Sequence, residues 1–302
     1  MRAAALLPWL LGLALALETS GSLEVRLEGR YAGGVFALEP VYAGSLLASE
    51  AWGGLLAEAA LYPRWNLATQ DIDAGISKLE LSYGAPGYAL GAGASPEPTA
   101  VLRLLSLFPL APPRPDFAPG LWGGWLEVYP DPFTRLRLAL RRVRDRPLGL
   151  FRADGRLAGV DYQLTALYGP TPAPAALGAG ATVRLGPWVV YGEGWRGWRT
   201  ADPWRGGVGA SRYLADGLFT AEAAYAGGWQ FALAYGRQAG EDWAVDALAR
   251  LNADAGGLRA AAAALRLSRF GDEGDVLLGL GLGYDAAMGA FWLPSLAARV
   301  YF

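Results

Sequence analysis

Residues 23–31 read LEVRLEGRY, a stretch in which apolar and charged side chains alternate strictly from Leu23 to Glu28. Successive side chains of a β-strand point to opposite faces, so this alternation predicts a strand with one apolar face and one charged face. The same period of two returns in many later segments. They lie at 78–83, 135–141, 160–165, 182–185, 219–225, 242–247 and 276–285.

Turn-forming residues separate these segments, as at 130–132 (PDP) and 271–274 (GDEG). We also expect a short strand over residues 147–152 that ends in a turn at 153–155 (ADG). Regularly spaced strands with tight turns are typical of an all-β meander, sandwich or barrel. A transmembrane barrel needs ~9–11 residues per strand and connections of a few residues. The chain length then fits about 16 strands, within a range of roughly 14–18. We therefore predict a closed antiparallel transmembrane β-barrel.

The cost of burying charge in lipid indicates which face of each strand points outward. Arg135, Arg137 and Arg141 alternate with leucines in one predicted strand. An arginine facing lipid at the bilayer midplane costs about 2–4 kcal/mol. Three of them would cost about 6–12 kcal/mol, which is comparable to the whole stability of a domain. We therefore expect the leucines to face lipid and the arginines to face the lumen.

The N-terminus has the form of a secretory signal peptide. Arg2 precedes an apolar run, and residues 14–16 (ALA) supply a small-residue cleavage site. We expect residues 1–16 to be the signal peptide and residues 17–302 to be the barrel. An uncleaved N-terminal anchor is the alternative, although the run is short for a span of roughly 20 residues.

The C-terminus carries an alternating strand that ends on an aromatic residue, with Leu296, Ala298 and Val300 on the face of Phe302. This ending resembles the C-terminal signal of bacterial outer-membrane barrels, which the barrel-insertion machinery recognises. The resemblance covers the last strand specifically and the rest of the chain only as a pattern. It implies an outer-membrane location, with Val300, Tyr301 and Phe302 forming the insertion signal and the machinery and membrane lipids as partners.

Composition excludes several classes of function. The 302 residues contain no histidine and no cysteine, which removes Ser-His-Asp triads, cysteine nucleophiles, disulfides and ordinary zinc sites. A net charge of −2 disfavours nucleic acid as a partner. We predict neither a cofactor nor a metal, and no enzymatic activity. A carboxylate pair acting on glycans is a minor alternative.

A proline-rich segment interrupts the strand pattern between residues 95 and 119, so it cannot be one continuous strand. Its middle, residues 101–110, is apolar and suggests a short helix. The sequence leaves two placements equally open. The segment folds into the lumen and narrows it, as in porins, or it lies outside as a cap or as a loop packed on the rim.

The predicted lumen carries both signs of charge, with Glu127 near Arg135 across the hairpin at 129–133. This inventory indicates either a network of ion pairs or a charged, water-filled pore that favours anions or sugars. The candidate pore-lining residues are Arg26, Arg30, Glu127, Arg135, Arg137, Arg141, Arg184, Glu193, Glu222 and Arg266.

Two functions follow from this inventory. The first is a channel that resembles porins or polysaccharide-export barrels and serves the passive or selective passage of small hydrophilic or anionic solutes. The second is a non-transporting structural or envelope-tethering barrel with a filled interior. Gly279, Gly281 and Gly283 leave room for a pore or for a packed loop, so they do not decide between the two. The pattern does not indicate an oligomeric state.

Overall fold

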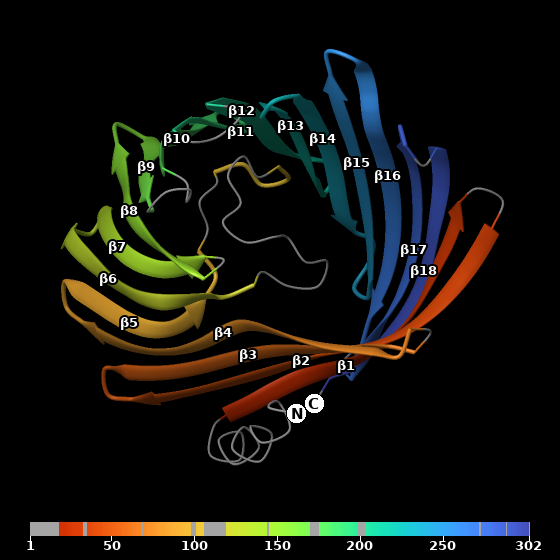
Figure 1. The fold of residues 1–302 in the computed structure, drawn as a ribbon, viewed down its shortest axis with the longest axis horizontal. Helices are drawn as coiled ribbons and strands as arrows, with labels where there is room; N and C mark the ends of the chain where they lie inside the picture. Colours follow the sequence, from red (N-terminus) through yellow and green to blue (C-terminus); the bar gives the residue numbers. More distant parts are fainter. Residues whose placement is uncertain are drawn as a thin grey trace.

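The computed structural model describes residues 18–32, 35–67, 69–97, 101–105, 119–143, 145–169, 175–198, 203–271, 273–287 and 289–301. The predicted signal peptide and Phe302 lie outside these ranges. No helix in the described ranges is long and apolar enough to cross a membrane. The described residues form a ring of 18 strands (Figure 1). The strands are β1 (Glu18–Ala32), β2 (Val35–Trp52), β3 (Leu55–Asn66), β4 (Asp71–Ala85), β5 (Tyr88–Ser95), β6 (Leu121–Asp131), β7 (Thr134–Val143), β8 (Arg146–Leu157), β9 (Val160–Tyr168), β10 (Ala175–Leu185), β11 (Trp188–Trp198), β12 (Trp204–Leu214), β13 (Gly217–Tyr225), β14 (Trp229–Gln238), β15 (Trp243–Asp254), β16 (Gly257–Phe270), β17 (Gly274–Asp285) and β18 (Gly289–Tyr301).

The sheet closes on itself. Each strand pairs antiparallel with the next in sequence, and β1 also pairs with β18, so that Leu23 lies opposite Val300 and Leu27 opposite Leu296. A closed ring leaves no strand edge with unsatisfied backbone groups, which a sheet in lipid requires. The predicted barrel is confirmed, and its 18 strands lie at the upper end of the predicted range.

One predicted turn is wrong. The sequence suggested a short strand that ends before a turn at residues 153–155, but β8 runs without interruption to Leu157. The turn lies at Ala158 and Gly159, which both have positive φ values, of 49° and 81°. Two-residue hairpin turns of this kind match the twist of the flanking strands. Asp154 stays in the strand because its carboxylate binds Arg135 on β7.

The outward face of the barrel is apolar, as the cost of lipid-facing arginines predicts. On β7, Leu138 and Leu140 are 56% and 61% exposed, whereas Arg137 and Arg141 point inward and form ion pairs. On β18, Leu296 and Val300 share the exposed face, as expected from the C-terminal pattern. The exposed apolar residues therefore form a coat suited to lipid.

The two ends of the barrel differ in the length of their connections. At the end that holds both termini, no connection exceeds four residues; we call it the short-turn end. The opposite end, the long-loop end, holds the connections between β5 and β6, β9 and β10, and β11 and β12. Outer-membrane barrels place short turns in the periplasm and longer loops outside, so the long-loop end corresponds to the extracellular side.

Candidate functional site

Part of the long connection between β5 and β6 lies inside the barrel. Residues 101–105, which we call the interior segment, run next to the inner wall at β11 and β13 (Figure 1). The sequence left this placement open between the lumen and an external cap. The predicted helix over 101–110 is absent from residues 101–105, and the remainder of it lies outside the described ranges.

Two wall carboxylates hold the backbone of the interior segment. Glu193 on β11 accepts a hydrogen bond from the N–H of Val101, at 2.5 Å between Oε2 and N. Glu222 on β13 accepts three more, from the N–H groups of residues 103, 104 and 105 at 2.6, 2.9 and 2.8 Å. Both carboxylates are buried, and hydrogen bonds to an ionised acceptor are roughly twice as strong as neutral ones. These hydrogen bonds therefore fix the backbone path of the interior segment and do not depend on the identity of its side chains.

Side chains of the interior segment add packing to these backbone bonds. Leu102 and Leu105 are buried in a cluster that includes Tyr191 and Trp195 of β11. Gly207 on β12 makes room for Leu102, because a Cβ at this glycine would lie 2.7 Å from the Cδ1 of Leu102.

Arg103 is the charged member of the interior segment. Its guanidinium lies 5.0 Å from the ring centroid of Tyr191 and donates to the hydroxyl of Ser211 at 3.3 Å. From the other side, the Nη2 of Arg250 on β15 donates to the backbone oxygen of Leu104 at 3.0 Å. Contacts from β11, β12 and β15 therefore converge on these few residues.

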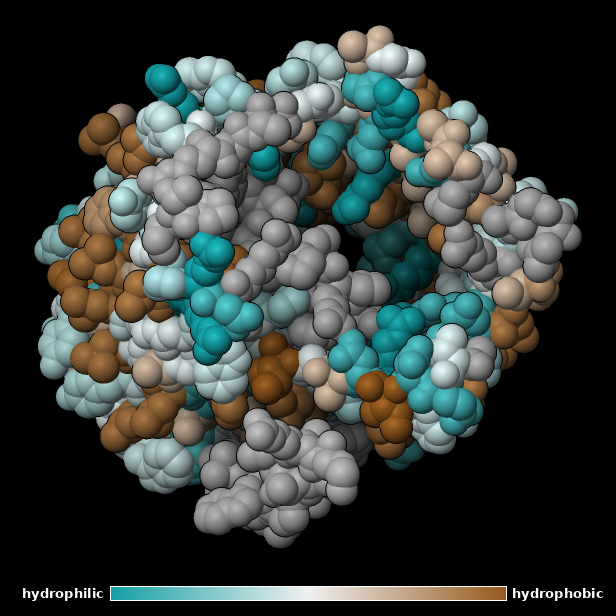
Figure 2. All heavy atoms as spheres, in the orientation of Figure 1, coloured by the Kyte–Doolittle hydropathy of each residue, from teal (hydrophilic) through white to brown (hydrophobic). Residues whose placement is uncertain are grey.

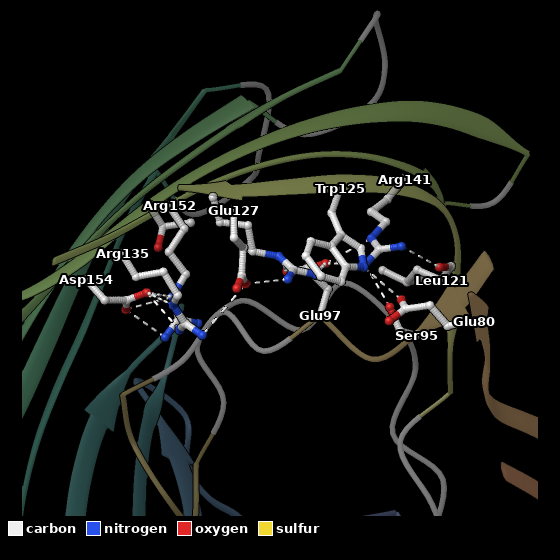
Figure 3. Close-up of polar contacts among 12 residues, drawn as sticks. Glu80, Ser95, Glu97, Leu121, Trp125, Glu127, Arg135, Arg141, Arg152 and Asp154 are labelled. Carbon is white, nitrogen blue, oxygen red and sulfur yellow. Dashed lines mark hydrogen bonds and ion pairs between the residues drawn. The ribbon is translucent and has the colours of Figure 1, made fainter. Parts of the chain in front are cut away.

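A second anchor holds the start of the same connection, at Glu97. Its carboxylate forms ion pairs with Arg137, at 2.9 Å between Oε1 and Nε, and with Arg141, at 2.8 Å between Oε2 and Nη2. Figure 3 shows Glu97 near Arg141 of β7. Arg141 is 1% exposed and also donates to Ser95 and to the backbone oxygen of Leu121. It therefore fastens the connection to the wall and makes no contact with solvent.

The ion pairs continue along β6, β7 and β8 towards the short-turn end (Figure 3). Glu127 binds Arg137 at 2.6 Å and lies 3.8 Å from Arg135. Asp154 binds both Arg135 and Arg152, at 2.9 and 2.8 Å. The arginine row of β7 is therefore neutralised by carboxylates from three neighbouring segments, as the network interpretation of the sequence expected.

The opposite wall keeps an open cavity of about 380 Å³. Its charged lining comes from β1, β16 and β18 and comprises Glu24, Arg26, Glu28, Arg266 and Arg299. Arg26 binds Glu24 and Glu28 at 2.5 and 3.0 Å, and Arg299 binds Glu24 at 2.5 Å. Among the described residues, no ion pair involves Arg266, whose Nε donates to the hydroxyl of Ser268 at 3.2 Å.

The predicted pore-lining residues thus fall into distinct places. Arg26 and Arg266 line the cavity, whereas Glu193 and Glu222 hold the interior segment. Glu127, Arg135, Arg137 and Arg141 belong to the network of β6–β8. Arg184 lies by the β10–β11 turn, where it donates to the backbone oxygen of Gly186, and Arg30 lies on β1 with its side chain outside the described part. Tyr301 of the predicted insertion signal donates to Asp275, an interaction that points its ring away from the face of Val300.

Sequence reasoning missed Glu97, Tyr191 and the cavity residue Arg299. Glu97 stands between Pro96 and Pro98 in a segment with no strand pattern, so alternation does not reveal it. Arg299 alternates with Ala298 and Val300 in the last strand, and that pattern was sufficient to place it inward.

No protein-family model and no curated protein matches this sequence. The fold is similar to solved structures at low identity. Pseudomonas aeruginosa OccK2 (OpdF) aligns with a TM-score of 0.72 and 11% identity over 96% of this chain and 98% of that chain. Acinetobacter baumannii OccAB4 aligns with a TM-score of 0.67 and 7% identity, over 94% and 97%. The outer membrane protein opdK from Pseudomonas aeruginosa aligns with a TM-score of 0.67 and 10% identity, over 94% and 98%. The chain therefore shares the closed-barrel fold of these bacterial proteins.

Proposed function

We propose that this chain is an outer-membrane channel and that small hydrophilic solutes cross it along the wall formed by β1 and β14–β18. One observation carries the proposal. The interior segment is bound to the wall at β11 and β13, while a polar cavity stays open on the wall at β1 and β16–β18. Figure 2 shows a hollow in the barrel that is bordered by hydrophilic residues.

Small side chains keep this wall open. Inward positions of β16 are alanines, including Ala262 and Ala264, and those of β17 are Gly279, Gly281 and Gly283. The alanines of β16 leave space next to the lumen, in contrast with the arginines and tyrosines on the wall that carries the interior segment. The side chains of Leu293 and Phe291 on β18 lie against Gly281 and Gly283. A solute on this side meets charged groups at Arg26, Arg266 and Arg299.

The charge of the cavity favours anionic solutes within this class. The guanidiniums of Arg26 and Arg299 are already paired with Glu24, whereas Arg266 takes part in no ion pair among the described residues. Asp246 lies opposite Arg266 in the strand register but forms no ion pair with it. A cation outside an ion pair beside a narrow aqueous path raises the local concentration of anions.

Single-channel recording in planar bilayers tests the channel and its path. The purified protein is expected to give step-like currents. Ala262→Trp places a large side chain in the lumen and is expected to lower the step size. Ala263→Trp is the matched control, because this neighbouring residue is exposed on the outward face of the same strand.

A filled, non-conducting barrel is the alternative, and the same recording distinguishes it. Absence of steps from folded protein would refute the channel and favour a structural barrel. Steps of equal size in Ala262→Trp and Ala263→Trp would refute the path along β16.

A further inference from the structure

A groove of about 560 Å³ lies on the outward face of the barrel, across β8 to β12. Its walls include the exposed side chains of Leu164, Leu177 and Trp204. Its floor is made of small residues, among them Ala179 and Gly194. Cavities of ~300–1,000 Å³ are the size that holds a small organic ligand. This groove faces lipid, so its occupant comes from the membrane.

The strand register explains why the floor is empty. Leu164, Ala179, Gly194 and Gly206 lie directly opposite one another on successive strands, so three small residues follow one leucine. A Cβ at Gly194 would meet nothing within 4 Å. No neighbouring side chain therefore fills the space that the glycine leaves.

Two arginines line the groove at one end, Arg196 and Arg205, and Arg205 lies opposite the buried Trp195 in the strand register. Arg196 of β11 is exposed on the outward face, two residues before the strand ends at Trp198 on the long-loop end. Its guanidinium lies 5.6 Å from the ring centroid of Trp198 and 5.0 Å from that of Trp204. No ion pair within the described part of the chain involves Arg196. The two rings hold a cation at headgroup level, where tryptophans gather in membrane proteins.

We propose that this groove binds one phosphate-bearing lipid of the outer leaflet, with the phosphate at Arg196 and an acyl chain over Ala179 and Gly194. A guanidinium matches phosphate oxygens with two parallel hydrogen bonds and is the preferred partner of phosphate in proteins. The apolar lining accepts a hydrocarbon chain and offers almost no polar group to a hydrophilic ligand. Charge and lining together fit a molecule that is anionic at one end and apolar at the other. This proposal depends on the barrel lying in a membrane and not on its conducting solutes.

Native mass spectrometry of the purified, delipidated protein tests the proposal, with phosphatidylglycerol as the anionic probe and phosphatidylcholine as the neutral one. The parent chain is expected to bind one phosphatidylglycerol more tightly than phosphatidylcholine. Arg196→Gln is expected to weaken phosphatidylglycerol binding roughly tenfold, the effect of losing hydrogen bonds between charged groups. Gly194→Leu fills the floor and is expected to weaken both lipids. A folded-barrel check by gel mobility and circular dichroism accompanies each variant.

Arg212→Gln is the matched control. Arg212 also points outward and lies 5.4 Å from the ring centroid of Trp188, but it stands on the short-turn end and lines no part of the groove. Its substitution is expected to leave binding unchanged. Equal affinity of the parent for both lipids, or equal losses in Arg196→Gln and Arg212→Gln, would overturn the proposal. Displacement of the lipid by millimolar inorganic phosphate would show a phosphate site without a lipid, and a dimer lost in Gly194→Leu would show an interface between copies. Both of these outcomes also overturn it.

Discussion

Glu222→Gln is expected to release the interior segment from the wall while leaving the barrel folded. The carboxylate of Glu222 accepts three backbone hydrogen bonds from residues 103–105, at 2.6, 2.9 and 2.8 Å, and a fourth from the hydroxyl of Tyr191 at 2.8 Å. Gln has nearly the same shape but no charge, and its amide nitrogen is a donor that faces other donors. The substitution therefore attacks the anchor without creating a cavity.

The three backbone hydrogen bonds determine how much free energy the docked segment is expected to lose in Glu222→Gln. A hydrogen bond to a charged group stabilises by about 1.5–3 kcal/mol, about twice the value for a neutral pair. Neutralising the acceptor of all three therefore costs the docked segment about 2–4 kcal/mol. At 1.4 kcal/mol per factor of ten, the opening equilibrium rises by ~30-fold to ~700-fold.

The rate at which a buried thiol reacts measures this opening. The chain has no cysteine, so Leu105→Cys introduces a single reporter at a position that is 7% exposed. A water-soluble thiosulfonate is expected to modify this thiol slowly in the parent background and at least ~30-fold faster with Glu222→Gln. Glu28→Gln is the control, because Glu28 lines the opposite wall and is not expected to change the rate. Equal rates in the Glu222→Gln and Glu28→Gln backgrounds would refute the anchoring role of Glu222.

Two further substitutions test the charges of the interior. Arg141→Ala removes one of the two partners of the buried Glu97, so we expect the free energy of unfolding in urea to fall by about 3–5 kcal/mol. Arg142→Ala is the control, because it breaks only an exposed ion pair, and it is expected to change this free energy by less than about 1 kcal/mol. Arg266→Gln removes a cation from the cavity. At ~6 Å in water, the attraction of the Arg266 charge for an anion is about 0.7 kcal/mol before screening by salt. The anion preference, measured from the reversal potential in a salt gradient, is therefore expected to fall roughly two- to threefold. Arg269→Gln is its control, because Arg269 lies outside the cavity lining and its guanidinium is 5.8 Å from the ring centroid of Trp243; an equal shift in both variants would contradict a role for the cavity charge.

The fold was largely predictable because the lipid-facing and lumen-facing side chains of a barrel strand alternate along the sequence with a period of two. Leu138 and Leu140 are exposed and Arg137 and Arg141 point inward, as the cost of a lipid-facing arginine required. The strand number was harder to predict. Residues 153–155 contain a typical turn sequence, yet they stay in β8 because Asp154 is paired with arginines on its own and the neighbouring strand. Local turn propensity yields to such pairing across strands.

The partners of the interior charges were predictable only where a tight turn fixes the register. Glu127 and Arg135 lie on the two strands of one hairpin, so their proximity was predicted, and the structure places them 3.8 Å apart. A register shift between Val128 and Asp131 places Arg137 directly opposite Glu127, and this closer pair, at 2.6 Å, was not predicted. Glu97 binds Arg141, which is 44 residues away along the chain. No local sequence pattern predicts this long-range ion pair, because it depends on how the connection between β5 and β6 turns into the lumen.

The same limit explains why the interior segment could not be recognised from its own residues. Its sequence, VLRLL, suggested a helix, but its N–H groups are taken up by Glu193 and Glu222 of the wall instead of by a helical turn. A carboxylate that binds backbone N–H groups places little demand on the side chains it holds, so the information for docking lies in β11 and β13. On those strands both glutamates look like ordinary lumen-facing charges. A buried, inward-facing glutamate with no arginine opposite it in the register is therefore the signal to look for, and Glu222, opposite Gly209 and Ala232, has that environment.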